Sequence, residues 1–209
     1  MGEIVVIGGG GHAKVLICVL KKTGWNVLGY TDPENRGEIL GAPYLGGDDT
    51  LAALLAAHPA CRAVVGVGKI TAGDGRLRLQ RAAEALGFEF AVVVSPQAVV
   101  NEEVTLGRGT VVFDGVVVNS GTIVGECCIL NTNSTMEHDC RLGDNVHVAP
   151  GATVSGGVTI GDNCLVGVGA GILQGVTICP GCLIGMGAAV VTGITEPGTY
   201  AGVPARRIS

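Results

Sequence analysis

The chain has few aromatic residues and few charges. Phenylalanine, tryptophan and tyrosine together make up 3% of its 209 residues, and charged residues make up 15%. A core without large rings must be narrow and built from valine, isoleucine, leucine and alanine. Apolar residues still account for 47% of the chain, which excludes an intrinsically disordered protein and indicates a globular one.

Other absences exclude whole classes of function. Lysine and arginine are scattered and the net charge is −5, so no basic surface predicts binding to nucleic acid. No uninterrupted apolar run reaches the roughly 20 residues of a membrane span. The opening MGEIVVIGGGGH has no basic region before its apolar run, so it indicates a buried strand rather than a signal peptide. We therefore expect a cytoplasmic protein with eight reduced cysteines.

The first 95 residues alternate strand and helix patterns. Alternating units of this kind predict a small parallel sheet with helices on its faces, a Rossmann-like α/β half domain. The expected strands are 4–8, 26–32, 62–68 and 88–94, and the expected helices are 12–24, 48–58 and 75–87. We expect Val15, Leu16, Val19 and Leu20 to form the buried face of the first helix.

A strict period of six begins at Val100. Every sixth residue from there to Val190 is aliphatic or methionine, and the residue two before each one, from Val104 to Ala188, is small or β-branched. Neither a helix nor an ordinary strand has this period. A three-sided parallel β-solenoid does, with one flat side for each six residues and 18 residues for each coil. Glycines that follow the aliphatic position, at 107, 125, 143 and 161, are expected where the backbone turns.

This repeat resembles the hexapeptide repeat of left-handed parallel β-helix acyltransferases. Together with the first half, the EHDC stretch (137–140) and the GVPAR tail (202–206), it resembles bacterial sugar O- and N-acetyltransferases similar to sialic-acid O-acetyltransferase and UDP-N-acetylbacillosamine acetyltransferase. The resemblance implies a nucleotide-sugar-binding domain over 1–95 and a left-handed β-helix acetyltransferase domain with a C-terminal cap over 96–209. It also implies a homotrimer with coenzyme A between neighbouring prisms.

Glu137, His138 and Asp139 fall on the outer side of the solenoid, between the inward positions Met136 and Cys140. A neutral imidazole can take a proton near pH 7, and a nearby carboxylate can fix its tautomer. Neighbouring residues on a strand point to opposite sides, so contact between Asp139 and His138 depends on the corner geometry. The alternative is that His138 is a surface histidine with no role in catalysis. The resemblance implies that His138 is the general base and Asp139 its acidic partner, with Glu137 in a supporting or solvated position.

Further site residues come from the resemblance. It implies that Gly156 supplies a backbone N–H to the oxyanion and that coenzyme A is contacted by His147, Val168, Met186 and Arg206. We expect His147 to point outward from the next face of the prism. Arg206 has an alternative role as part of a simple cap on the solenoid.

The run of glycines from Gly8 to Gly11 follows a strand and opens a helix, so backbone N–H groups can receive a phosphate. The spacing GxGxxA with an acid about 20 residues later also fits a dinucleotide site. About 95 residues leave room for one mononucleotide half only, which favours a nucleotide-sugar. The resemblance implies that Gly10, Gly11, His12, Asp32 and Gly68 contact it. Lys69 could bind the diphosphate or could be solvated.

Cys179 and Cys182 form a CxxC, a spacing found in zinc and redox sites. The chain has no second CxxC to complete a zinc site, and Cys182 occupies an inward position of the repeat. We therefore predict no metal site and treat the inward cysteines as small hydrophobic residues.

The sequence thus predicts an acetyl-CoA-dependent N-acetyltransferase that uses a histidine base on a UDP- or GDP-linked 4-amino-deoxy sugar in surface-glycan synthesis. The resemblance leaves a sialic-acid-type O-acetyltransferase as an alternative. A solenoid that binds a nucleotide-sugar without catalysis is the other alternative.

Overall fold

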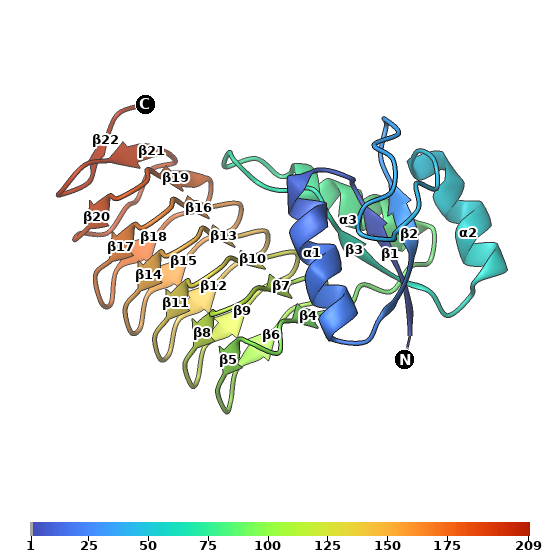
Figure 1. Cartoon of the computed structure of the whole chain (residues 1–209). Helices are drawn as coiled ribbons and strands as arrows, with labels where there is room; N and C mark the ends of the chain where they lie inside the picture. Colours follow the sequence, from blue (N-terminus) through green and yellow to red (C-terminus); the bar gives the residue numbers. More distant parts are fainter. Residues whose placement is uncertain (1) are drawn as a thin grey trace.

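The computed structural model describes residues 2–209, and its first part is a small α/β unit (Figure 1). A parallel sheet in the order β2-β1-β3 has helices packed around it. The elements are β1 (Glu3–Ile7), α1 (Gly11–Lys22), β2 (Asn26–Thr31), the 3-10 turn η1 (Asp48–Thr50), α2 (Leu51–Ala57), β3 (Arg62–Val65) and α3 (Gly75–Ala85). The predicted alternation of strand and helix is confirmed.

Two details of this unit differ from the prediction. Val15 is exposed, and α1 buries Ala13 and Ile17 instead, because the sheet meets a face turned slightly from the predicted one. The predicted fourth strand, 88–94, is divided between two structures. Phe90 makes a single bridge to Ala63 of β3, whereas β4 (Val93–Val94) pairs with the solenoid. The division of the chain at residue 95 stays a prediction.

The rest of the chain is a three-sided solenoid of short strands, each side a separate sheet (Figure 1). We name the sides by their strands. The first sheet contains β4, β7 (Val111–Val112), β10 (Ile129–Leu130), β13 (His147–Val148), β16 (Leu165–Val166), β19 (Cys182–Ile184), β21 (Gly198–Ala201) and the antiparallel β22 (Arg206–Arg207). The second sheet contains β5 (Val99–Val100), β8 (Val117–Val118), β11 (Thr135–Met136), β14 (Thr153–Val154), β17 (Gly171–Ile172) and β20 (Ala189–Val190). The third sheet contains β6 (Thr105–Leu106), β9 (Ile123–Val124), β12 (Arg141–Leu142), β15 (Thr159–Ile160) and β18 (Thr177–Ile178).

The period of six places the predicted side chains inside the prism. Every aliphatic position from Val112 to Val190 is buried, as is every small position from Thr110 to Ala188. Val100 and Leu106 are partly exposed because no coil lies beneath the first one. Registers of 18 residues hold from the β4–β7 pair to the β17–β20 pair, as in the pairing of Met136 with Val154, and the register is 16 residues where β19 meets β21. The solenoid prediction is confirmed.

The corners are made by a different residue from the one predicted. Every sixth residue from Glu103 to Gly187, three after an inward aliphatic, has a positive φ. Glycine, asparagine or aspartate occupies most of these positions, since these residues tolerate the left-handed conformation best. The glycines at 107, 125, 143 and 161 serve close packing instead. A Cβ on Gly107 would lie 2.5 Å from the backbone of Gly125 in the next coil.

The α/β unit covers the first sheet of the solenoid. The His12 ring stands edge-on against Phe113 with 5.3 Å between the ring centroids, and α1 packs on β4. At the two borders of this sheet, Lys22 pairs with Asp114, and Arg81 pairs with Glu126. The second and third sheets, and the corner between them, lie outside this interface.

Candidate functional site

His138 and Asp139 lie on the corner between β11 and β12. The Nδ1 atom of His138 lies 2.8 Å from the Oδ2 atom of Asp139, a hydrogen bond between adjacent residues. The positive φ of Asp139, 58°, makes this possible, because the strand alternation that would separate the two side chains ends there. Both side chains are open to solvent, with 66% and 73% of their surfaces exposed. A carboxylate that accepts from Nδ1–H leaves Nε2 free to take a proton.

Gly156 lies beside this imidazole in the next coil. A Cβ built on Gly156 would be 2.6 Å from Nε2 of His138, so no larger residue fits here without moving the ring. Gly157 N–H donates to the carbonyl of His138 over 2.9 Å and holds the two coils in register. Within residues 2–209, no protein group accepts from the Gly156 N–H. The imidazole therefore lies against Gly156, and a role of the Gly156 N–H as an oxyanion donor stays a prediction.

Glu137 is part of a polar ladder along the border of the second sheet. Its Oε2 accepts from the amide of Asn119 over 2.8 Å, and Asn119 in turn accepts from the amide of Asn101 over 2.7 Å. The ladder fixes the Glu137 carboxylate next to, but not on, His138. A supporting role for Glu137 stays a prediction.

His147 points outward from the prism as expected, but it is not open to solvent: it is 9% exposed beneath the loop after β3. Its Nδ1 donates to the carbonyl of Lys69 over 2.8 Å, and its Nε2 accepts from the amide of Asn131 over 3.1 Å. Burial lowers the pKa of His147 to about 4. The sequence showed that His147 leaves the prism but not that another domain covers it. Contact with coenzyme A stays a prediction.

His12, Gly68 and Lys69 meet at this same junction. Gly68 lies against His12, because a Cβ added to Gly68 would be 3.4 Å from the Cβ of His12. Burial, with Arg76 and His147 nearby, lowers the pKa of His12 to about 3. Lys69 is buried and its ammonium donates to the carbonyl of Gly73. The alternative of a solvated lysine is therefore wrong.

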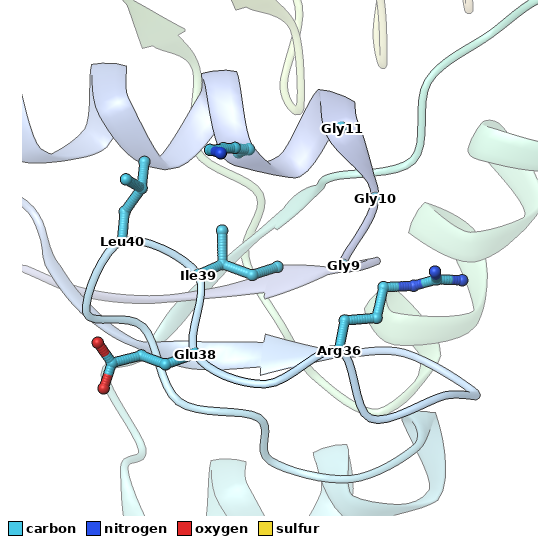
Figure 2. Close-up of a pocket in the computed structure, with 8 residues that line it drawn as sticks. Gly9, Gly10, Gly11, Arg36, Glu38, Ile39 and Leu40 are labelled. Atoms are coloured by element: carbon cyan, nitrogen blue, oxygen red, sulfur yellow. The ribbon is translucent and has the colours of Figure 1, made fainter.

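The glycine loop borders a cleft of about 510 Å³ (Figure 2). Gly10 caps the N-terminus of α1, and a Cβ on Gly10 or Gly11 would meet nothing within 4 Å, so the space beside these two residues is open. Sequence reasoning missed Lys14 and Arg36, which line the same cleft. Lys14 follows Gly10 by one helical turn, a signal that the sequence did contain. Arg36 is in an irregular segment that no periodicity marks.

Asp32 supports this loop rather than facing open solvent. Its Oδ2 accepts from Gly9 N–H over 2.8 Å, and its Oδ1 accepts from Glu34 N–H over 3.0 Å. Burial pushes the pKa of Asp32 up, but these two N–H groups and the Arg36 guanidinium outweigh it and hold the pKa below its usual range. The carboxylate therefore stays ionised and shapes the glycine loop.

The remaining predicted contacts lie towards the C-terminal end of the solenoid. Val168 and Met186 are both exposed, and one coil separates them, with Gly187 N–H donating to the carbonyl of Val168. Arg206 is exposed and its guanidinium donates to the carbonyl of Ala205, whereas Arg207 pairs with Glu196 over 2.6 Å. Nothing in residues 2–209 gathers three or more potential metal ligands.

His138 and the glycine cleft are far apart in the architecture of one chain. The α/β unit, with the cleft at its glycine loop, rests on the first sheet and its two borders. His138 occupies the corner between the second and third sheets, which is the edge of the prism opposite that interface.

Both parts of the chain match known protein families. Residues 3–78 match the PglD N-terminal domain family, residues 121–156 match the bacterial transferase hexapeptide family, and residues 157–192 match the hexapeptide repeat of succinyl-transferase. No curated protein sequence matches the chain.

Solved structures match over the full length. The acetyltransferase domain of PglB from Neisseria gonorrhoeae is 33% identical, with a TM-score of 0.93 and all of both chains covered. PerB of Caulobacter crescentus, solved with CoA and GDP-perosamine, is 36% identical with a TM-score of 0.93, covering 100% of this chain and 98% of PerB. WeeI from Acinetobacter baumannii is 26% identical with a TM-score of 0.86, covering 98% of this chain and 99% of WeeI.

The predicted family and fold are thereby confirmed, including the left-handed β-helix that the repeat resembled. None of the helices in residues 2–209 is long and apolar enough to cross a membrane. The solved acetyltransferases that match this chain over its full length support the same conclusion as the PglD-type first domain and the hexapeptide solenoid. The chain belongs to the hexapeptide-repeat sugar N-acetyltransferases, and it is an acyltransferase.

Proposed function

We propose that this enzyme transfers the acetyl group of acetyl-CoA to the amine of a nucleotide-linked 4-amino-deoxy sugar, as a step of surface-glycan synthesis. The observation that carries the proposal is the hydrogen-bonded pair of His138 and Asp139 beside Gly156. Full-length similarity to PerB, solved with CoA and GDP-perosamine, supports the choice of both substrates.

The chemistry follows from the atoms at the corner. As the sugar nitrogen attacks the thioester carbonyl, Nε2 of His138 takes the proton that the nitrogen loses, and Asp139 stabilises the imidazolium. A C–N bond forms, and the negative charge on the carbonyl oxygen is stabilised by the Gly156 N–H. Collapse of this intermediate breaks the C–S bond. The coenzyme A thiolate leaves and recovers the proton from the imidazolium.

The cleft beside Gly10 and Gly11 suits the nucleotide-sugar. The N–H groups at the start of a 12-residue helix favour an anion such as a diphosphate, and the Lys14 and Arg36 side chains add positive charge. His12, Asp32 and Gly68 shape this end of the domain. On the solenoid, we assign His147, Val168, Met186 and Arg206 to the coenzyme A side.

We further propose a homotrimer, because one chain holds its cleft and its base on opposite sides of the prism. A neighbouring prism would bring the cleft of one subunit to the His138 corner of another. The cytoplasm is the compartment that fits, since it would keep the eight free cysteines reduced.

Release of the coenzyme A thiol tests the proposal. Acetyl-CoA is supplied with GDP-linked and UDP-linked 4-amino sugars, and separately with sialic acid, whose acetylation would indicate the O-acetyltransferase alternative. His138→Ala is expected to lower kcat by about 10²–10⁴-fold. His58→Ala, which removes a surface histidine paired with Glu3, is the matched control. Undiminished turnover by His138→Ala would show that His138 is not the general base.

A further inference from the structure

Cys179 and Cys182 are a pair of thiols in contact at the last corner of the third sheet. Their Sγ atoms are 3.5 Å apart. Cys179 is half-buried and Cys182 is fully buried, so only the first is open to a reagent in solution. The proposed acyl transfer uses neither side chain.

The backbone at this corner already has the shape that a disulfide needs. Cys179 and Cys182 are the first and fourth residues of a turn with Pro180 second and Gly181 third, and Gly181 has a φ of 74°. Proline and left-handed glycine in these places form a type II turn, whose end Cα atoms lie within about 7 Å. Disulfides span Cα separations of roughly 4.4–6.8 Å. The turn therefore brings the two Cα atoms near the separation that a disulfide spans, and the sulfurs are already in contact.

The turn is also held in place from both sides. Gly181 N–H donates to the carbonyl of Asp162 in the preceding coil over 2.8 Å, and Cys179 N–H donates to the carbonyl of Ile194 over 2.9 Å. The thiol of Cys182 points to the carbonyl of Glu196 over 3.7 Å, in the segment that caps the solenoid. The two thiols are thus kept near each other in the folded chain.

We propose that Cys179 and Cys182 form a reversible disulfide, which makes the corner between β18 and β19 a redox-sensitive site. A small disulfide such as glutathione disulfide is the oxidant. Cys179 attacks one of its sulfurs as the thiolate, forming a mixed disulfide and releasing one glutathione thiol. Cys182 then loses its proton and attacks the Cys179 sulfur, which forms the intramolecular bond and releases the second glutathione thiol. Two protein thiols are oxidised and one glutathione disulfide is reduced.

The exchange is tested on the full-length folded protein. The protein is incubated with glutathione disulfide, denatured, treated with N-ethylmaleimide and digested with chymotrypsin. Cleavage after Leu173 and Leu183 releases the segment 174–183, which holds both cysteines and excludes Cys164. We expect this segment to be lighter by two hydrogen atoms and to carry no maleimide, whereas dithiothreitol restores two maleimide adducts.

Three other results would overturn the proposal: a segment with two maleimides after oxidation, a lasting glutathione adduct on Cys179, or a bond from Cys182 to Cys164. Cys164 is the nearest competitor, because its Sγ accepts from Cys182 N–H over 3.4 Å. Cys18→Ser, which removes the exposed cysteine of α1, is the matched control and should give the wild-type result. Cys179→Ser should leave Cys182 fully alkylated once the protein is denatured.

Discussion

The imidazole of His138 rests against the α-carbon of Gly156, one coil further along the solenoid. A Cβ at that point would be 2.6 Å from Nε2, which is closer than two such atoms can approach. We predict that Gly156→Ala pushes the ring from its place and lowers kcat by about 10²-fold, the effect expected when a catalytic group is displaced by about 1 Å. Steady-state kinetics measure the loss.

The matched control is Gly193→Ala. Its Cβ would lie at an ordinary 3.5 Å from the nearest atom, the carbonyl oxygen of Thr177. Both glycines lack a positive φ, so alanine adds no backbone strain at either position. Equal activity in the two variants would show that the contact with His138 has no role in turnover.

Asp139→Asn separates the charge of this side chain from its shape. Asparagine is also tolerated at a φ of 58°, so the corner should stay intact and the thermal midpoint should change little. The neutral amide stabilises an imidazolium less than a carboxylate does, so kcat should fall by roughly tenfold or more. Kinetics and a thermal melt on the same preparation decide the matter. A wild-type kcat would mean that Asp139 is not the partner of the base.

Arg36→Met tests the cleft at the glycine loop. The side chain is half exposed beside Asp32 and Glu34, so its loss should affect binding more than folding. Because a charge-assisted hydrogen bond is worth about 1.5–3 kcal/mol, we predict a rise of about 10-fold or more in KM for the nucleotide-sugar. The KM for acetyl-CoA should not change.

Arg78→Met provides the comparison for this cleft. Arg78 is an exposed residue of α3 that pairs with Asp74 and does not line the cleft. A similar KM increase in both variants would remove the specific role of Arg36.

The pH dependence of folding follows from the junction between the two domains. His147 has a pKa of about 4 in the folded protein and 6.5 as its ordinary value, so the unfolded chain binds the proton more tightly. The contribution of neutral His147 to the free energy of unfolding is therefore complete above pH 6.5 and is lost as the pH falls towards 4. We expect a loss on the order of 2 kcal/mol from this residue across that window.

Urea unfolding at several pH values measures this effect. His147→Gln should be less stable than the wild type at pH 8, and its stability should decrease less steeply between pH 6.5 and 4.5. Parallel curves of unfolding free energy against pH for the two proteins would show that another group causes the loss of stability in acid. His12, with its pKa of about 3, remains in both proteins and supplies the residual slope.

The solenoid could be predicted in detail because its period is local and repeated. Each inward residue, such as Met136 or Val148, belongs to one pattern with many independent copies. The outward position of His138 follows from that pattern by counting. Its contact with Asp139 does not, since it requires the left-handed backbone at a corner, and the sequence left that geometry open.

Residues at the domain junction could not be placed in the same way. A period of six shows that His147 points out of the prism, but only the packing of the α/β unit shows that Lys69 covers it. Phe90 and Val93 were assigned to one strand because both are apolar and β-prone. Their separation is decided by which sheet offers a free edge, and this is a tertiary property.

The opposite placement of the cleft and the His138 corner has a genetic consequence for the proposed trimer. Every reaction centre would draw its base from one polypeptide and its nucleotide cleft from another. Two variants, one without the imidazole and one without the Arg36 guanidinium, should therefore be more active refolded or co-expressed together than separately, when the nucleotide-sugar is well below its KM. Random mixing in equal amounts would leave about a quarter of the centres with both groups intact. Lesions at His138 and Gly156 share one corner and should show no such rescue.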